Sequence, residues 1–308
     1  MRYQFYTADV FTRQIFGGNQ LAVFPDARGL DAALMQQVAR EFNLSETVFV
    51  LPPDDPAHTR RLRIFTPATE LPFAGHPTIG AAHILASIGA IPLHQQRTAI
   101  VFEEGVGPIP VTIVAHDGRP VAAQLTAAQR PAFGPPPPPI SDLAAVLSLH
   151  ESDLLEGDYR PQAVSCGVPF LFVPLRDRAA LGRARVQGER WEQVVAPFWA
   201  PHLYLLTFDV AGGAQLRARM FAPAMGIAED PATGAAATAL GGYLGVRDST
   251  ADGTLRWIVE QGVEMGRPSQ IEVLVDKTGG QIQAVHVGGS SVMVGEGSVD
   301  IPPDPVLC

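Results

Sequence analysis

The sequence predicts an α+β fold with two pseudo-symmetric domains, each a curled, mostly antiparallel sheet or open barrel around one central buried helix. Residues 75–82 are echoed half a chain later by residues 230–236, with His76 and Asp230 at the same place in the two copies. Each copy opens an uncharged stretch of helical length, and a helix that is apolar on all sides must be buried. Self-similarity at half the chain length indicates two like domains.

The echo extends upstream of both motifs. Residues 63–68 match residues 219–224, with two extra residues before His76. Two ionisable side chains are therefore expected at matching helix starts, and a site is expected between them.

The first half reads as short strands around a helix. A turn at residues 17–19 contains two glycines, which tolerate the positive φ of a tight turn. Pro77 suits the first helical position because its missing N–H would have no partner there, and Gly89 follows as a stop. We expect helices over 31–42 and 77–87, and strands over 3–11, 21–24, 47–51, 61–66, 99–102, 107–114 and 121–125.

The second half repeats this arrangement after a stiff proline run at 135–139. Expected helices cover 141–149, with Ser141 as the N-cap, 188–198 and 231–244, and expected strands cover 162–165, 170–174, 203–208, 255–260, 270–275, 281–287 and 291–295. We predict one domain over residues 1–118, joined by about 286–308, and a second over 119–285.

Composition narrows the class of protein. Of 308 residues, 17% are charged, below the roughly 25% of an ordinary soluble domain, which indicates a large interior or an apolar interface. The net charge of −9 comes without a Lys/Arg cluster, so nucleic-acid binding is not expected. Two cysteines form neither a disulfide framework nor a zinc site, and with no signal-peptide pattern at the start a reducing, cytoplasmic location is expected.

The uncharged stretch between Glu70 and Arg97 resembles a membrane span. It contains three prolines, three histidines and three glycines, and a buried soluble helix is the better interpretation. No membrane association is expected.

The repeated motifs indicate an anion site. Unpaired amides and a partial positive charge at helix amino ends favour anions, so the amides that follow His76 and Asp230 are candidates to hold a carboxylate. The alternatives are that Asp230 only caps its helix and that His76 is structural.

Other chemistries find little support. The histidine spacing gives no metal cluster, and neither a phosphate loop nor a GxSxG elbow occurs. Cys166 has no activating base nearby in sequence and reads as a small buried hydrophobe. Glu46 enters an apolar strand; it is either solvated or partly buried, and burial would raise the pKa of its carboxyl toward neutrality, as proton transfer requires.

Several segments together resemble the PhzF-like isomerases of phenazine biosynthesis and their relatives, which share the diaminopimelate epimerase fold. The matching segments are Gly18-Asn19 and residues 43–47, 72–78, 229–234 and 260–268. The resemblance implies proton transfer between carbons of a small carboxylate substrate by a homodimer, without cofactor or metal. It implies Glu46 as general acid/base, assisted by His76 and Asp230.

The resemblance also implies substrate contacts by five residues, which are Asn19, Gly75, Thr78, Gly234 and Ala235. Ala235 stands where the phenazine enzyme has a serine, so its substrate, 2,3-dihydro-3-hydroxyanthranilate, cannot be assumed. The two-thiol epimerases carry cysteines where this chain has His76 and Asp230. The alternatives are a non-catalytic binding protein of the same fold and a thiol racemase that uses Cys166.

Overall fold

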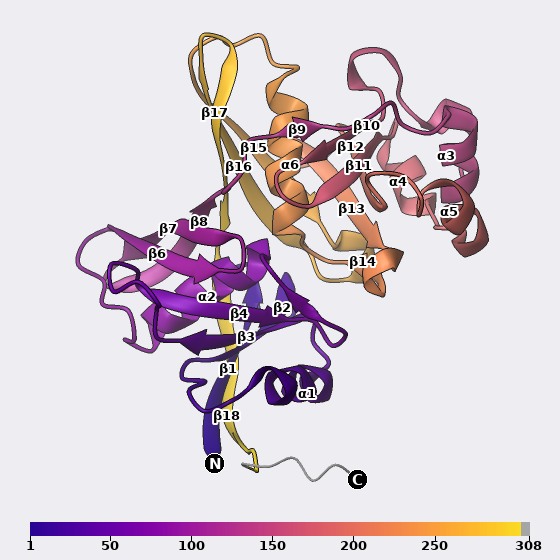
Figure 1. Ribbon diagram of the computed structural model, residues 1–308. Coiled ribbons are helices and arrows are strands. Elements are labelled where there is room, and N and C mark those ends of the chain that lie inside the picture. The colour runs from indigo at the N-terminus through magenta and orange to yellow at the C-terminus, as the bar shows by residue number, and fades with distance from the viewer. Residues whose placement is uncertain (303–308) are drawn as a thin grey trace. The chain divides into compact units, whose positions relative to one another are not determined.

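The computed structural model describes residues 1–302, which divide into two compact units (Figure 1). Unit 1 contains Met1–Thr126 and the chain from Gly288 on, and unit 2 contains Ala127–Val287. The expected boundary at 118/119 falls inside a hairpin, because β8 (Arg119–Thr126) pairs with β7 (Gly107–His116) and stays in unit 1. The expected return segment begins at Gly288, and its residues 303–308 lie outside the described residues.

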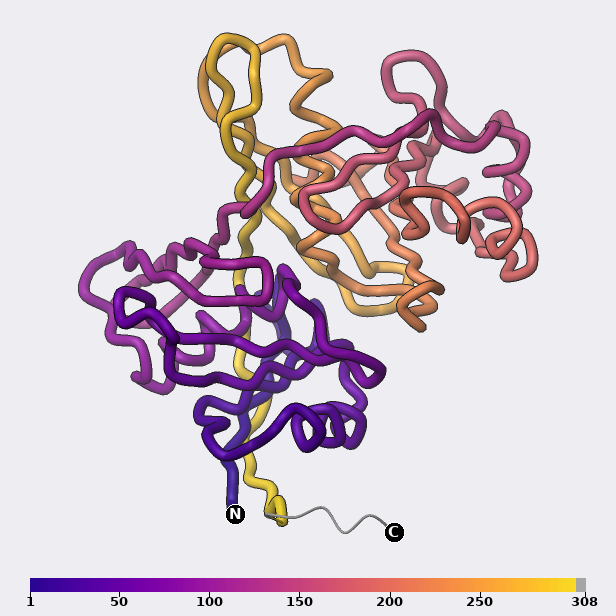
Figure 2. The backbone as a smooth tube through the Cα atoms, viewed as in Figure 1, coloured from indigo at the N-terminus to yellow at the C-terminus, as the bar shows by residue number. Residues whose placement is uncertain are grey.

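Unit 1 is built from short strands in mostly antiparallel pairs. Besides β7 and β8 its elements are β1 (Arg2–Val10), β2 (Asn19–Phe24), α1 (Ala32–Phe42), β3 (Glu46–Leu51), β4 (Arg60–Phe65), β5 (Glu70–Leu71), α2 (Gly75–Ser87), β6 (Arg97–Glu104) and β18 (Ser291–Asp300). Strand β1 pairs antiparallel with both β2 and β18, so the yellow end of the chain runs beside its indigo start (Figure 2). The pairs β2–β3 and β4–β6 are parallel.

Unit 2 repeats this order of pairing. Its elements are β9 (Ala132–Phe133), α3 (Ile140–Leu147), β10 (Gln162–Ser165), β11 (Pro169–Pro174), α4 (Arg178–Arg183), α5 (Gly188–Val194), β12 (His202–Thr207), β13 (Leu216–Ala222), β14 (Ile227–Asp230), α6 (Gly234–Gly245), β15 (Gly253–Gln261), β16 (Ser269–Thr278) and β17 (Gln281–Gly289), which runs across the boundary. Here β11–β12 and β13–β15 are the parallel pairs, matching β2–β3 and β4–β6. The predicted α+β fold and internal duplication are confirmed.

Each unit has one helix buried almost on all sides. In α2 every residue except Ser87 is buried, and in α6 every residue except Ala235. Helix α2 packs on β1, β2, β3, β7, β8 and β18, and α6 packs on β10, β11 and β16. Gly80 allows the close approach in unit 1, because a Cβ there would lie 2.4 Å from Leu21 Cδ2.

The predicted helix starts were wrong at both central helices. Helix α2 begins at Gly75, two residues before Pro77, because Ala74 is the last extended residue; a proline is tolerated in a first turn, whose amides lack helical partners. Helix α6 begins at Gly234, three residues later than expected, because Thr233 is still extended.

Of the other helix predictions, one was accurate and two needed correction. Helix α1 matches the expectation, with Asp31 as an N-cap that accepts from Leu34 N at 2.8 Å. Helix α3 begins at Ile140 after Pro139, so Ser141 lies within it and is not its N-cap. Helix α5 ends at Val194, and α4 had not been expected.

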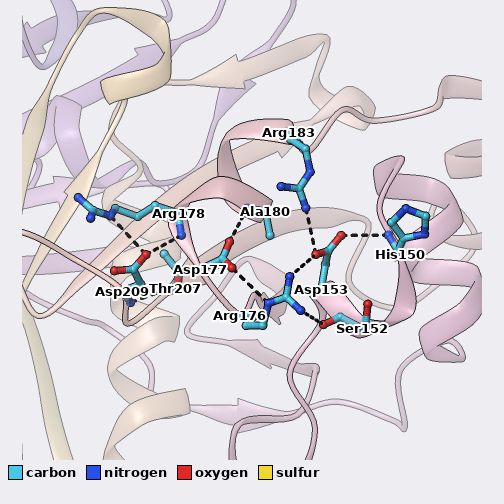
Figure 3. A network of polar contacts seen from close by, with 10 residues as sticks. All are labelled: His150, Ser152, Asp153, Arg176, Asp177, Arg178, Ala180, Arg183, Thr207 and Asp209. Carbon is cyan, nitrogen blue, oxygen red and sulfur yellow. Dashed lines mark hydrogen bonds and ion pairs between the residues drawn. The ribbon is translucent and has the colours of Figure 1, made fainter.

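A polar network in unit 2 links α4 to the segments before and beside it (Figure 3). The buried carboxylate of Asp153 accepts from Arg176 at 3.1 Å, from Arg183 at 3.0 Å and from the backbone N–H of His150 at 3.1 Å. Asp177 caps α4 through Ala180 N. These bonds fasten α4 and the turn after α3 to the strand β11.

Candidate active site

His76 and Glu46 form a buried polar pair in unit 1. His76 is the second residue of α2 and Glu46 is the first of β3, and both are more than nine-tenths buried. Nε2 of His76 lies 3.1 Å from Oε2 of Glu46, within the distance over which a proton can pass directly.

Asn19 completes this cluster from the first residue of β2. Its amide nitrogen lies 3.2 Å from Nδ1 of His76, and it is fully buried. Strands β2 and β3 run parallel, with Leu21 opposite Glu46, so their starts bring Asn19 and Glu46 to the same edge. Gly18 makes this turn possible: it has φ +59°, and a Cβ would lie 2.2 Å from the carbonyl oxygen of Val10.

Burial determines the charge of the His76 imidazole. Burial lowers the pKa of His76 to about 3, and a hydrogen bond with the backbone of Gln20 acts in the opposite direction. The ring is therefore neutral near pH 7. If the Asn19 amide donates to Nδ1, the resulting tautomer carries its ring proton on Nε2, the nitrogen 3.1 Å from Oε2 of Glu46.

The first turn of α2 also carries Gly75 and Thr78. Both are buried. The hydroxyl of Thr78 lies 2.7 Å from Ala74 O and 2.5 Å from Oε1 of Glu104, the last residue of β6. Thr78 is thus bonded within the protein. Gly75 and His76 supply the free amides of this turn, since Pro77 has none.

Asp230 belongs to a second cluster, in unit 2. It is buried at the end of β14 and accepts from the Thr233 hydroxyl at 2.5 Å. Gln261, the last residue of β15, donates to Asp230 O at 2.8 Å and to Thr233 Oγ1 at 3.0 Å. The Tyr204 hydroxyl donates to Gln261 Oε1 at 3.2 Å, so the loop before α6 is fixed from two strands.

Gly234 and Ala235 are the first two residues of α6, and Ala235 is half-buried. Asp230 lies four residues before this helix, whereas His76 lies inside α2, so the expectation of matching helix positions was wrong. Asp230 also does not cap α6, because Thr233 is the N-cap.

The structure therefore brings Asn19, Glu46 and His76 into direct contact, with Gly75 and Thr78 on the same turn. Asp230, Gly234 and Ala235 gather around the start of α6 in the other unit. The sequence reasoning gave no role to Glu104 or Gln261. A signal was present, because residues 103–106 (Glu-Glu-Gly-Val) echo residues 260–263 (Glu-Gln-Gly-Val).

Two further chemistries can be compared with the structure. Burial raises the pKa of the Cys166 thiol to about 12, which disfavours the thiolate that a thiol racemase needs.

Among residues 1–302, no group of three or more His, Cys, Asp and Glu side chains is arranged to hold a metal ion. Over the same residues, no helix is long and apolar enough to cross a membrane.

A family model described as phenazine biosynthesis-like protein (PhzC-PhzF) matches residues 8–297. The chain belongs to this family. An uncharacterised isomerase of Mesorhizobium japonicum is 39% identical over 95% of this chain and 97% of its own length. A trans-2,3-dihydro-3-hydroxyanthranilate isomerase of Pseudomonas aeruginosa is 35% identical over 96% and 98%. Because relatives that match almost the whole chain are isomerases, this member of the family is an isomerase.

Solved structures of the family share the fold. A predicted epimerase from Pseudomonas aeruginosa superposes with a TM-score of 0.81 at 33% identity, covering 97% of this chain and all of the other. A PhzF-family protein from Bacillus anthracis, at 24% identity, gives 0.86 over 98% and 100%. A hydroxyproline epimerase from Agrobacterium vitis shares the fold at a TM-score of 0.65 and 16% identity, covering 99% and 94%.

Proposed function

We propose that this isomerase moves a proton between carbons of a small carboxylate substrate without a cofactor, using Glu46 as the general acid/base. The observation that carries the proposal is the buried contact of 3.1 Å between Glu46 Oε2 and His76 Nε2. A buried carboxylate beside a neutral hydrogen-bond donor suits a group that must take and return one proton.

The proposed step balances within the substrate. The Glu46 carboxylate removes a proton from a carbon whose electron pair is stabilised by conjugation to the substrate carboxylate. The proton on Glu46 exchanges with solvent, protonated Glu46 then donates a proton to another carbon, and the double bond shifts between them. Neutral His76 holds the Glu46 oxygen through Nε2–H, and since the pKa of His76 is about 3, an imidazolium is not the acid.

The substrate carboxylate would be bound by backbone amides. The candidates are the amides of Gly75 and His76 at the start of α2 in unit 1 and those of Gly234 and Ala235 at the start of α6 in unit 2, because the partial positive charge at each helix amino end favours an anion. In this proposal Asn19 orients His76, Asp230 supports proton movement, and Thr78 acts through the position of the α2 turn.

Solvent exchange tests the proposal. Candidate acids, including trans-2,3-dihydro-3-hydroxyanthranilate and hydroxyproline, are incubated with the protein in D2O, and deuterium at substrate carbon is measured by NMR. The expected result is incorporation by the native protein and none by Glu46→Gln. Binding of an acid without exchange would instead support a non-catalytic binding protein, and loss of exchange after thiol alkylation would support Cys166.

The assembly and location are also proposals. The low charged fraction of 17% is compatible with an apolar interface, and we propose a homodimer in the cytoplasm. Light scattering after size-exclusion chromatography measures the molar mass in solution, and a mass equal to that of one chain would contradict the dimer.

A further inference from the structure

Glu104 and Gln261 occupy equivalent positions in the two units. Glu104 ends β6, which runs parallel to β4, and Gln261 ends β15, which runs parallel to β13. Each is followed by a glycine packed on the proline segment before the central helix: a Cβ on Gly105 would lie 2.8 Å from Pro72 Cα, and one on Gly262 would lie 2.5 Å from Pro231 O. The duplication thus places a carboxyl in unit 1 where unit 2 has an amide.

Both side chains hold the start of a central helix through a threonine. In unit 2 the amide of Gln261 donates to Thr233 Oγ1, and the Thr233 hydroxyl donates onward to Asp230. In unit 1 Oε1 of Glu104 lies 2.5 Å from Thr78 Oγ1, which in turn lies 2.7 Å from Ala74 O. The two chains of contacts are alike in kind, each running from residue 104 or 261 through a threonine hydroxyl to an acceptor before or at the helix start, if position 104 supplies a donor.

Counting protons decides which form of Glu104 fits. The Thr78 hydroxyl has one proton, and Ala74 O can only accept. If Glu104 were ionised, the two acceptors at 2.5 and 2.7 Å would compete for that proton, and Ala74 O would keep only the longer bond from Thr78 N at 3.4 Å. If Glu104 is protonated, its O–H donates to Thr78 and Thr78 donates to Ala74 O, so both short contacts are satisfied.

We propose that Glu104 is a positioning residue that works as a neutral carboxylic acid, the counterpart of Gln261, and that its proton fixes the α2 turn carrying Gly75 and His76. Oε2 of Glu104 is buried without a hydrogen-bond partner in the described part of the chain, which a charged oxygen would tolerate poorly. The consequence for activity rests on the proposed function; the consequence for structure does not.

The charges around Glu104 agree with a neutral acid. Burial raises its pKa to about 8, against hydrogen bonds from Thr78 and the Ala74 backbone. Four charged side chains line the same depression, of about 660 Å³, and they form the pairs Arg61–Asp54 and Arg63–Glu70. Each guanidinium is already matched by its own carboxylate, so neither is left over to stabilise an ionised Glu104.

Thermal unfolding between pH 5 and pH 9 tests the proposal. If Glu104 has a pKa of about 8 in the folded state, against 4.5 in the unfolded chain, the protein loses stability as the pH rises through that window, because the folded state holds the proton longer. Glu104→Gln removes the titration but keeps a donor. We expect its melting temperature to gain at least about 5 °C on the native protein across this range, and parallel curves would overturn the proposal.

Two substitutions serve as matched controls. Glu103→Gln, one residue earlier, removes a carboxylate whose pKa is lowered to about 2 by the backbone N–H groups of Asp54 and Asp55 and by His58, so its difference from the native protein should not grow with pH above about 5. Gln261→Glu places a carboxyl in the equivalent position of unit 2 and should introduce an alkaline loss. If Gln261→Glu lowered the melting temperature by the same amount at all pH values, positions 104 and 261 would not be equivalent.

The effect on the site is read from His76. In Glu104→Ala the imidazole signals of His76, assigned by their absence in His76→Gln, should shift, and in Glu104→Gln they should stay. The rate of solvent deuterium exchange should fall at least tenfold in Glu104→Ala, mostly through kcat. In Glu104→Gln it should stay within about threefold of the native rate, and the loss of exchange at alkaline pH should occur at a higher pH than in the native protein. If no acid is turned over, the proposed function fails, while melting and NMR still decide the role of Glu104. Unchanged His76 signals in Glu104→Ala would overturn it.

Discussion

Nε2 of His76 and Oε2 of Glu46 lie 3.1 Å apart, from the second residue of α2 and the first residue of β3. Glu46 is held by the pairing of β3 with β2 and β4, and His76 by the packing of α2 among the strands of unit 1. The two side chains therefore meet in the core of unit 1 rather than in a surface loop.

The first prediction concerns the proton carrier. Glu46→Gln keeps the shape of the side chain but removes the base, so deuterium exchange should fall by about 10²- to 10⁴-fold with an unchanged circular dichroism spectrum. Glu41→Gln on the exposed face of α1 is the control and should retain full exchange. Retained exchange in Glu46→Gln would exclude Glu46 as the base.

The second prediction concerns the protonation of His76. Because burial lowers its pKa to about 3, its imidazole should stay neutral from about pH 4.5 to pH 9 in ¹⁵N NMR spectra. A midpoint near pH 6.5 for this ring would contradict the prediction.

The same shift makes stability depend on pH on the acid side. Unfolded histidine binds a proton near pH 6.5, before folded His76 does, so stability should fall as pH drops from about 6.5 toward 3. Burial lowers the pKa of His83 and of His202 to about 4, so both act in the same direction. The measurement is the midpoint of urea unfolding at each pH; a midpoint that rises on acidification would refute this.

The third prediction uses the internal repeat as its own control. Arg219 pairs with Glu229 at 2.8 Å with side chains 4% and 17% exposed, whereas the matching pair Arg63–Glu70 is 25% and 41% exposed. Arg219 also donates to two backbone carbonyls at the end of α4. Arg219→Met should cost about 3 kcal/mol, and Arg63→Met at most about 1 kcal/mol.

Urea unfolding with hydrogen exchange assigned to each unit measures both costs. The larger loss should appear in the amides of α4 and β13. Equal losses for the two variants would show that burial does not set the energy of these pairs.

The fourth prediction concerns specificity at the start of α6. Ala235 is half-buried beside Gly234, and a serine there would add a hydroxyl donor at little steric cost. A hydrogen bond worth about 1 kcal/mol corresponds to about fivefold in affinity. Ala235→Ser should therefore lower KM for trans-2,3-dihydro-3-hydroxyanthranilate about fivefold, while Ala235→Gly should not. No difference between the two would mean that residue 235 does not contact substrate.

The sequence predicted the features that depend on local pattern. The repeat around His76 and Asp230 and the uncharged helices of both halves gave the fold class, and Gly18 takes the positive φ that its turn required. Helix starts were less predictable. Pro77 indicates the first turn of a helix, but a proline is tolerated at more than one position of that turn. The helices begin where the extended backbone ends, which is at Ala74 before α2 and at Thr233 before α6.

The environment of a charged side chain was harder still to predict. Glu103 and Glu104 are adjacent in sequence, yet hydrogen bonds lower the pKa of the first to about 2 and burial raises that of the second to about 8. Alternation along β6 sends them to opposite faces, but only the packing of α2 decides which face excludes water.

The pairing of β1 with β18 affects the order in which the protein is completed during synthesis. Arg2–Val10 leave the ribosome long before their partner Ser291–Asp300, because the rest of both units lies between them in the chain. Ala127–Val287 are available before then. Unit 2 can therefore finish folding on the ribosome, whereas unit 1 must wait with one edge of β1 unpaired, and a stop codon shortly before Ser291 would leave that edge exposed permanently.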